Sequence, residues 1–456
     1  MLDNALQLAR AGRPQAEAEL FQLLSIPSIS TLPEHRLDCR RAADWLVAKL
    51  RGMGMEAELV DVREPGHPVV VAEWLGRPGA PTLAVYGHYD VQPADPLEEW
   101  LTPPFEPTLK DGFVYARGAD DNKGQHLAGV KAAEYWFQAR GPPLNLRFFI
   151  EGEEEASGRS LPDFLRANAA RLPSDYLLLA DGGFTAAGQP NLLTGLRGLL
   201  YTEIEVKGPA VDLHSGIFGG AAPNPFNSLG HVLAALKDRE GHILIPGFYD
   251  DVEPPSPQEL ADWAKDPVDD AELMRRMGTT ALPGEPGYSA RERIRCRPTL
   301  DVHGVIGGFT GTGSKTVIPA AAKAKVSMRL VPNQDPARIA AALREFVPSL
   351  ATEGTTARVI ELSSAAPVRV DVSHPGIAAA SRAFQAAFGA APLLTREGGS
   401  VPVTLDFQEA LRTQLIVTGF GLPDDALHSP NERYSLDQYH RGTEMVMHLM
   451  QELAAG

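Results

Sequence analysis

The 456-residue chain is poor in cysteine, with Cys39 and Cys296 as its only two. The pair could form a disulfide, but the first residues carry neither the basic segment nor the apolar segment of a secretion signal. We therefore expect two reduced thiols in a soluble, cytoplasmic protein. The sequence also lacks any apolar run near the ~20 residues that a transmembrane helix needs, so we expect no membrane partner.

The chain has no excess of basic residues. Lysine and arginine total 42 against 58 aspartates and glutamates, which gives a formal net charge of −16. This balance argues against nucleic acid and against anionic membranes as partners.

At 456 residues the chain is too long for one typical hydrophobic core, so we expect two domains.

Strand and helix patterns alternate in the first part of the chain, which predicts an α/β fold with a mostly parallel sheet flanked by helices. Near residue 196 the pattern changes to alternating strands of the antiparallel type, and near residue 368 the first pattern resumes. We therefore expect residues 1–195 and 368–456 to form a discontinuous catalytic domain. Residues 196–367 would form a smaller inserted α+β domain that acts as a lid and a dimerisation surface.

An acidic stretch, EGEEE at residues 151–155, directly follows the apolar strand pattern of residues 146–150. Runs of carboxylates usually form a solvated surface. In open α/β sheets, however, ligands bind just beyond the carboxyl ends of the strands. Carboxylates gathered there repel one another unless cations hold them. The stretch therefore indicates a metal site.

Other potential ligands follow neighbouring strand patterns. His88 and Asp90 follow residues 82–86, Asp181 follows residues 176–180, and His428 lies a loop beyond residues 414–418. Asp120 and Asp121 lie in a loop just before a predicted helix. One sheet would bring these side chains to the same edge. Two imidazoles with several carboxylates suit Zn²⁺, Mn²⁺ or Co²⁺, whereas an all-oxygen site would suggest Mg²⁺ or Ca²⁺.

Four motifs together carry a resemblance to a known family. They are GHYDVQP at 87–93, RGADDNKG at 117–124, EGEEEASG at 151–158 and HSPNE at 428–432. These resemble the dinuclear metallopeptidases, a family that includes acetylornithine deacetylase, succinyl-diaminopimelate desuccinylase, glutamate carboxypeptidase and the carnosine and cytosolic non-specific dipeptidases. The resemblance runs from about residue 20 to 450. Three further motifs are most similar to the dipeptidase branch: DLHSG at 212–216, RLVPN at 329–333 and TREGGS at 395–400.

The resemblance implies a site with two divalent metal ions, Zn²⁺ or Mn²⁺, with Co²⁺ as a further candidate. One ion would be bound by His88, Asp121 and Asp181, and the other by Asp121, Glu155 and His428. Asp121 would bridge the two ions, and its peptide bond to Asn122 would be cis. The family pattern places Lys123 two residues after the bridging aspartate, so Asp120 is not expected to be a ligand.

The resemblance also implies the catalytic groups. Glu154 would be the general base that activates a metal-bridging water, and Asp90 would hold the His88 imidazole in one orientation. Three consecutive glutamates leave Glu153 as an alternative base. His214 would stabilise the oxyanion, reaching into the site of a partner subunit in a homodimer formed by the inserted domain.

For the substrate, the resemblance implies a short peptide with a free terminal carboxylate. Arg329 would bind that carboxylate, because a guanidinium suits it chemically, and Thr316, Gly399 and Ser400 would be neighbouring contacts. The predicted reaction is hydrolysis of the amide bond of dipeptides or short peptides. An N-acyl-amino-acid deacylase or a carboxypeptidase of the same family is the alternative. A metal-binding relative without catalysis should have lost a ligand or the base, and none is missing here.

Overall fold

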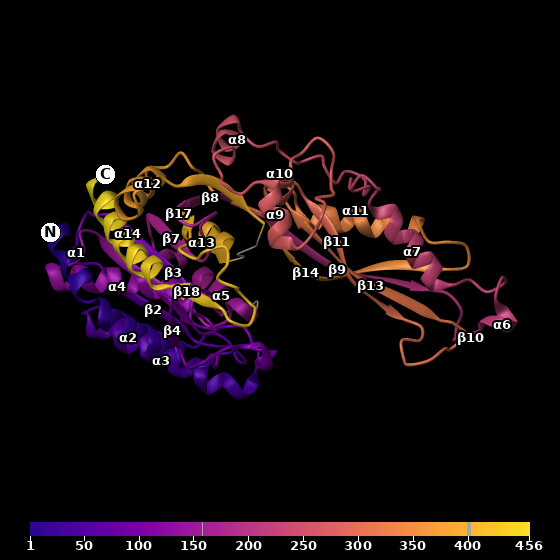
Figure 1. The fold of residues 1–456 in the computed structure, drawn as a ribbon, viewed down its shortest axis with the longest axis horizontal. Coiled ribbons are helices and arrows are strands. Elements are labelled where there is room, and N and C mark those ends of the chain that lie inside the picture. Colours follow the sequence, from indigo (N-terminus) through magenta and orange to yellow (C-terminus); the bar gives the residue numbers. More distant parts are fainter. Residues whose placement is uncertain (157, 399–402) are drawn as a thin grey trace.

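Two lobes make up the computed structural model, which describes residues 1–156, 158–398 and 403–456 (Figure 1). Both chain termini lie in the first lobe, where the sheet is enclosed by helices. The second lobe extends away from the first as a sheet with helices on one side. Among the described helices, none is long and apolar enough to cross a membrane. Neither Cys39 nor Cys296 forms a disulfide, and both are buried.

The first lobe is built on a six-stranded sheet with the order β1-β2-β6-β3-β7-β17. Its strands are β1 (Glu56–Val60), β2 (Val69–Trp74), β3 (Thr82–His88), β6 (Asn145–Glu151), β7 (Tyr176–Ala180) and β17 (Gln414–Thr418). The last four strands in this order run parallel, and β2 and β1 continue the sheet in antiparallel pairing. Every residue of β6 is buried, as expected for a central strand. The prediction of a mostly parallel sheet is confirmed.

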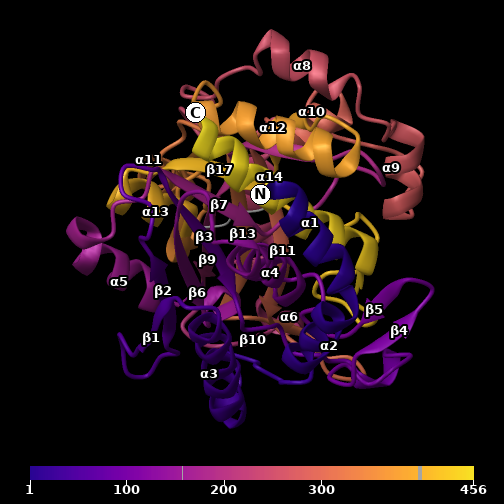
Figure 2. The ribbon, with the colours of Figure 1, turned by 90° about the vertical axis from the view of Figure 1, so that its left-hand side faces the viewer.

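Helices cover both faces of this sheet (Figure 2). They are α1 (Leu2–Ala11), α2 (Arg13–Leu24), α3 (Arg36–Gly52), α4 (Lys123–Ala139), α5 (Ser160–Asn168), α12 (Pro375–Phe388), α13 (Val403–Leu411) and α14 (Leu436–Ala455). Neighbouring side chains of β3 point to opposite faces of the sheet and show which helix covers each face. Val85 points toward Gly129 of α4, whereas the ring of Tyr86 contacts Phe407 of α13 at a centroid distance of 5.8 Å.

Two smaller sheets complete the first lobe. One contains β8 (Asn191–Leu196), β15 (Val368–Arg369) and β16 (Leu393–Glu397), and the other contains β4 (Thr108–Lys110), β5 (Phe113–Tyr115) and β18 (Arg433–Ser435). The turn between β4 and β5 has positive φ angles at Asp111 (52°) and Gly112 (83°). Asp-Gly suits such a turn because both residues tolerate the left-handed region.

The second lobe contains a four-stranded antiparallel sheet with the order β11-β13-β9-β14. Its strands are β9 (Gly198–Lys207), β11 (Thr299–Gly307), β13 (Ala321–Leu330) and β14 (Thr356–Ala365). Helices α7 (Pro225–Leu236) and α11 (Pro336–Ser349) share a hydrophobic cluster with alternate residues of β9 and β13. The outer end holds β10 (Leu213–His214), α6 (Ser215–Phe218) and β12 (Val317–Ile318). The predicted α+β character is confirmed.

A segment with three short helices packs beside β16. The helices are α8 (Pro257–Trp263), α9 (Asp270–Met277) and α10 (Ala290–Arg295). The Trp263 indole Nε1–H donates to the Leu394 carbonyl at 3.1 Å. Arg396 of β16 forms a two-pronged ion pair with Glu259 of α8, with N–O distances of 2.6 and 2.9 Å. This segment therefore belongs to the second lobe in sequence but is anchored on an element of the first.

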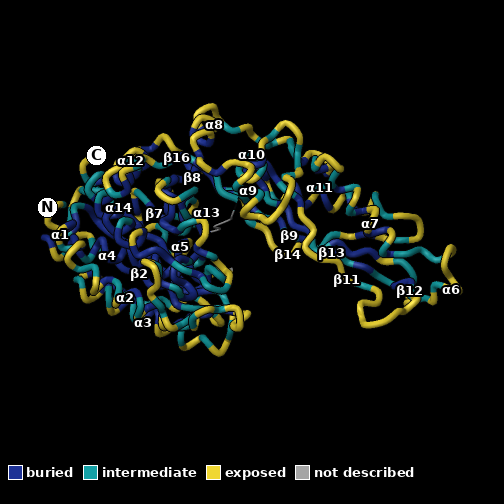
Figure 3. Tube along the Cα trace, viewed as in Figure 1, coloured by how far each residue is buried: buried dark blue, intermediate teal, exposed yellow. Residues whose placement is uncertain are grey.

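The buried hydrophobic side chains form two clusters. The larger cluster draws on residues 5–196 and 368–453, and the smaller on residues 200–357. Figure 3 shows the dense buried interior of the first lobe and the more exposed outer end of the second. The predicted domain boundaries, 1–195 with 368–456 and 196–367, stay a prediction that these clusters support.

Candidate metal centre

Five predicted ligands meet at one edge of the central sheet. His88 is the last residue of β3, Asp181 directly follows β7, and Asp121 lies just before α4. Glu155 and His428 come from loops beyond β6 and β17. They form two groups that share Asp121: His88, Asp121 and Asp181 in one, and Asp121, Glu155 and His428 in the other. Within each group one ligand atom per residue lies within 4.8 Å of the others.

The two carboxylate oxygens of Asp121 face different groups. His88 Nε2 lies 3.1 Å from Asp121 Oδ1 and 3.5 Å from an oxygen of Asp181. On the other side, His428 Nε2 lies 2.9 Å from Asp121 Oδ2 and 3.4 Å from Glu155 Oε1. This is the arrangement needed for a carboxylate that bridges two cations.

The donor set fits two divalent metal ions. Three carboxylates and two imidazoles converge here, and Glu155 Oε1 is a buried oxygen with no hydrogen-bond partner among the described residues. A cation between the groups would satisfy that oxygen and relieve the repulsion of the carboxylates. The nearby carboxylates of Asp121 and Glu155 raise the pKa of His428 to about 10, which shows that they favour positive charge at this position.

Asp90 contacts one residue of each donor group, His88 and Glu155. His88 Nδ1 lies 3.1 Å from the Asp90 carbonyl oxygen and 3.4 Å from its carboxylate, so Nε2 is the nitrogen left facing the site. The other carboxylate oxygen of Asp90 accepts from the Ser30 hydroxyl at 2.7 Å and from the Glu155 N–H at 3.1 Å. Asp90 therefore lies where it can orient both His88 and the Glu155 backbone.

Two supporting residues escaped the sequence analysis. Asn122 donates through its side-chain amide to Asp181 Oδ1 and to the Ala180 carbonyl, both at 2.7 Å. The Asp121–Asn122 peptide bond is cis, as the resemblance implies. Glu432 is fully buried and accepts from the N–H groups of Gly118, Asp120 and Asp121 and from the Arg117 guanidinium. Its position in the HSPNE motif was the only signal for this role.

The surroundings of the glutamates separate their roles. Glu153 accepts three backbone N–H groups, from His67 at 2.7 Å and from Arg159 and Ser160 at 3.0 Å each. Glu153 is thus engaged in holding its own loop. Glu154 lines the cavity at the metal centre, where burial raises the pKa of its carboxyl to about 9.

Asp120 lines the same cavity but is engaged by Gln125. Its carboxylate accepts from the Gln125 amide at 2.8 Å, and it belongs to neither group. Burial raises the pKa of this carboxyl well above its usual range. Its surroundings agree with the expectation that it is not a ligand.

A cavity of about 480 Å³ opens over the donor groups and is lined by Asp121, Glu154, Asp181 and His428. Glu397, the last residue of β16, also lines it, and burial raises the pKa of that carboxyl to about 7. Arg276 of α9, in the segment of three short helices, also lines this cavity. Sequence analysis missed both residues. Glu397 stands within the TREGGS motif, whereas no motif marks Arg276.

Arg329, Thr316 and His214 belong to neither donor group and are not among the described residues that line the metal cavity. Arg329 is on β13, opposite Leu199, and its charge adds to burial in lowering the pKa of Arg197 to about 10. His214 and Thr316 are exposed and adjacent, with the Ser215 N–H donating to the Thr316 carbonyl at 3.1 Å. Strand β10, which ends at His214, lies at the outer end of the second lobe (Figure 1). Gly399 and Ser400 lie outside the described residues.

Comparison with known proteins finds peptidases by family, by sequence and by structure. Residues 84–452 match the peptidase family M20/M25/M40. A Cys-Gly metallodipeptidase of Schizosaccharomyces pombe is 31% identical, with 100% of this chain and 98% of the relative covered. The crystal structure of human carnosine dipeptidase 1 is similar with a TM-score of 0.86 at 30% identity, covering 100% of this chain and 99% of that one. A metallo-carboxypeptidase of the M20 family from Sulfolobus solfataricus has a TM-score of 0.86 at 31% identity, covering 97% and 99%.

Proposed function

The chain belongs to the peptidase family M20/M25/M40, and from this premise we propose that it hydrolyses the amide bond of dipeptides or short peptides with a free terminal carboxylate. The observation that carries the proposal is the pair of donor groups that share Asp121, with Glu154 beside them in one cavity. The dipeptidase names of similar proteins support the choice of dipeptides.

We assign one divalent ion to His88, Asp121 and Asp181 and the other to Asp121, Glu155 and His428. Mixed imidazole and carboxylate ligands suit Zn²⁺ or Mn²⁺, with Co²⁺ as a further candidate. When bound, a pair of such ions lowers the pKa of water from 15.7 toward roughly 7 and polarises a carbonyl oxygen.

Glu154 is the proposed general base. Its carboxylate takes a proton from the attacking water and then delivers it to the nitrogen of the leaving amine. Burial favours its protonated form, which suits the second of these transfers. Asp90 and Asn122 keep His88 and Asp181 in place through the hydrogen bonds described above.

Arg329 is the proposed binding group for the terminal carboxylate of the substrate, with Thr316, Gly399 and Ser400 as neighbouring contacts. Wild-type enzyme should hydrolyse free dipeptides, and amidation of a good dipeptide should lower kcat/KM by about 10-fold to 100-fold, because a charge-assisted hydrogen bond is lost. The measurement is a hydrolysis panel of dipeptides, dipeptide amides, tripeptides and N-acetyl and N-succinyl amino acids, each with Mn²⁺, Zn²⁺ and Co²⁺.

The matched control for this panel is Arg329→Ala. In that variant amidation should carry no additional penalty, because the binding group is already absent. Equal hydrolysis of free and amidated dipeptides by the wild type would refute the role of Arg329. Preference for N-acyl amino acids would favour a deacylase. Release of C-terminal residues from longer peptides would favour a carboxypeptidase, as in the Sulfolobus solfataricus relative.

We also propose a homodimer in which His214 completes the site of the partner subunit. His214 is exposed at the outer end of the second lobe, on the two-residue strand β10 beside Thr316. It is not among the described residues that line the metal cavity of its own subunit. Closed two-fold dimers are the commonest oligomers, and in such a pair an extended loop can reach the neighbouring active site.

Mixed dimers test this proposal. Subunits with His214→Ala should be co-expressed with subunits carrying Glu154→Gln, each variant being nearly inactive alone. If His214 acts in the partner's site, a mixed dimer has one intact site and one site with both defects. A purified mixed dimer then has one active site in two, and the whole randomly paired mixture, of which about half is mixed dimer, has about one in four. The activity of the purified mixed dimer is the measurement, and an absence of recovery would place His214 in its own subunit.

A further inference from the structure

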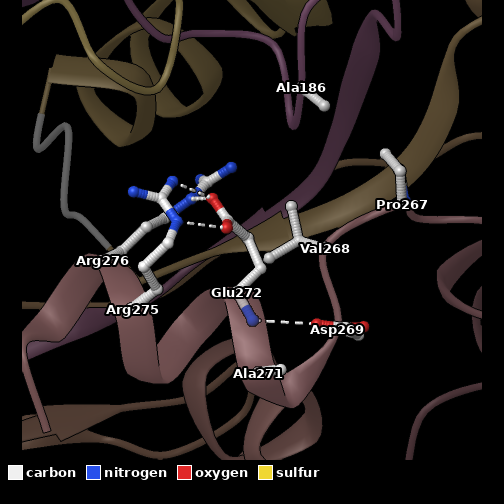
Figure 4. Close-up of a pocket in the computed structure, with 8 residues that line it drawn as sticks. All are labelled: Ala186, Pro267, Val268, Asp269, Ala271, Glu272, Arg275 and Arg276. Atoms are coloured by element: carbon white, nitrogen blue, oxygen red, sulfur yellow. Dashed lines mark hydrogen bonds and ion pairs between the residues drawn. The ribbon is translucent and has the colours of Figure 1, made fainter.

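A second cavity, of about 520 Å³, adjoins the metal cavity at Arg276, and half of the residues that line it belong to α9 (Figure 4). It is lined by Ala186, by residues 267–269 and by Ala271, Glu272, Arg275 and Arg276. Arg276 is the residue that its lining shares with the metal cavity. Residues 181–185 line the metal cavity, and Ala186 continues that loop into the outer one.

Buried contacts attach α8, the helix before α9, to the first lobe. This helix is attached to β16 through the Glu259–Arg396 ion pair and the Trp263 indole. Arg396 and Glu259 are each about nine-tenths buried in their side chains, so this ion pair is shielded from solvent. Glu397 follows Arg396 and lines the metal cavity. The strand that anchors α8 therefore also supplies a wall of the metal cavity, which Arg276 lines as well.

Both arginines of α9 pair with the same carboxylate, that of Glu272. Glu272 binds Arg275 through two hydrogen bonds of 2.7 and 2.6 Å, and it accepts from Arg276 through Nε alone, at 2.7 Å. Figure 4 shows the two guanidinium groups gathered around this single carboxylate. Two cations share one anion, and the terminal Nη groups of Arg276 have no hydrogen-bond partner in the described part of the chain.

Of the two arginines, Arg276 is the better placed to contact a substrate in the metal cavity. Its side chain is 35% exposed, compared with 72% for Arg275, which does not line the metal cavity. A planar guanidinium with free Nη groups binds a carboxylate in two-pronged fashion. We propose that Arg276 determines substrate specificity by binding the side-chain carboxylate of an aspartate or glutamate residue in the peptide. This inference rests on the proposed peptidase function.

The test compares peptides that differ only in charge: Glu-Ala with Gln-Ala, and Ala-Glu with Ala-Gln. In Arg276→Ala the ratio of kcat/KM for the glutamate peptide to that for its glutamine partner should fall on the order of 10-fold to 100-fold in one of the two pairs. The pair that responds identifies the peptide position whose side chain Arg276 contacts. Arg276→Glu should reverse the preference, favouring lysine at that position.

Arg275→Ala is the matched control, since it removes a neighbouring arginine from the same helix and the same ion pair. It should leave the ratio unchanged. An unchanged ratio in Arg276→Ala, or an equal change in Arg275→Ala, would overturn the assignment and leave Arg276 as part of a surface ion pair.

Binding to the Glu154→Gln enzyme separates this inference from the proposed function. Calorimetry with Glu-Ala and Ala-Glu measures Kd without turnover, and adding Arg276→Ala should weaken binding of one of them by a similar factor. If neither glutamine peptide is hydrolysed by the wild type and neither glutamate peptide binds, the proposed function and the inference that rests on it both fail. If the glutamine peptides are hydrolysed but Arg276→Ala affects neither ratio nor Kd, only the inference fails.

Discussion

Replacing Glu154 with glutamine is expected to reduce turnover by about 10²-fold to 10⁴-fold while leaving both metal ions bound. Glu154 belongs to neither donor group, so an amide in its place should not disturb the ligands. The amide cannot accept the proton of the attacking water. The measurements are kcat with a good dipeptide and the metal content by elemental analysis of the purified variant.

Glu153→Gln is the matched control for this prediction. Its carboxylate accepts three backbone N–H groups, so an amide there should reduce thermal stability with a smaller effect on kcat. A near-normal rate for Glu154→Gln would transfer the base role to Glu153. Loss of metal from Glu154→Gln would instead show that Glu154 is a ligand.

The position of the metal centre could be predicted because the carboxyl ends of neighbouring parallel strands lie at the same edge of the sheet. His88 ends β3, Asp181 directly follows β7, and the glutamates stand at and just beyond the end of β6, and these three strands are neighbours in the sheet. Side chains placed just after parallel strands meet whatever the details of the loops. The sequence pattern was therefore sufficient to predict which residues converge, although they are as distant in the chain as His88 and His428.

The roles of the three glutamates could not be separated in the same way. Glu153 differs from Glu154 only through its partners, the N–H groups of His67, Arg159 and Ser160. His67 is 86 residues away in sequence, and no local pattern announces such a contact. Assigning one carboxylate to a loop and the next to catalysis required the tertiary structure.

The segment that carries Arg276 was also hidden. Residues 240–300 are rich in proline, glycine and aspartate, which masks three helices of 6 to 8 residues. Two of these begin with a capping box, Ser256 with Glu259 and Ser289 with Glu292, a signal that could have located them. Their placement on β16 depends on the contacts of Trp263 and Glu259, which the sequence does not reveal.

A second large effect, loss of metal, is expected when Asp121, the carboxylate shared by the two donor groups, is replaced. Asp121→Asn should remove or scramble both metal ions, because Asp121 is the residue that the two donor groups share. A neutral amide cannot compensate the charge of two cations. Loss of metal affinity should exceed the roughly 10–100-fold that is typical when an outer partner of a ligand is removed. Metal content by elemental analysis and metal affinity by competition with a chelator are the measurements.

Asp120→Asn is the control that makes the prediction specific. The residue is adjacent in sequence and equally acidic, but its carboxylate accepts from Gln125 and is absent from both donor groups. Burial already favours its protonated form, so an amide replaces it with little change in charge. This variant should keep two metal ions. Equal metal content in the two variants would refute the bridge, and metal loss confined to Asp120→Asn would shift the ligand assignment by one residue.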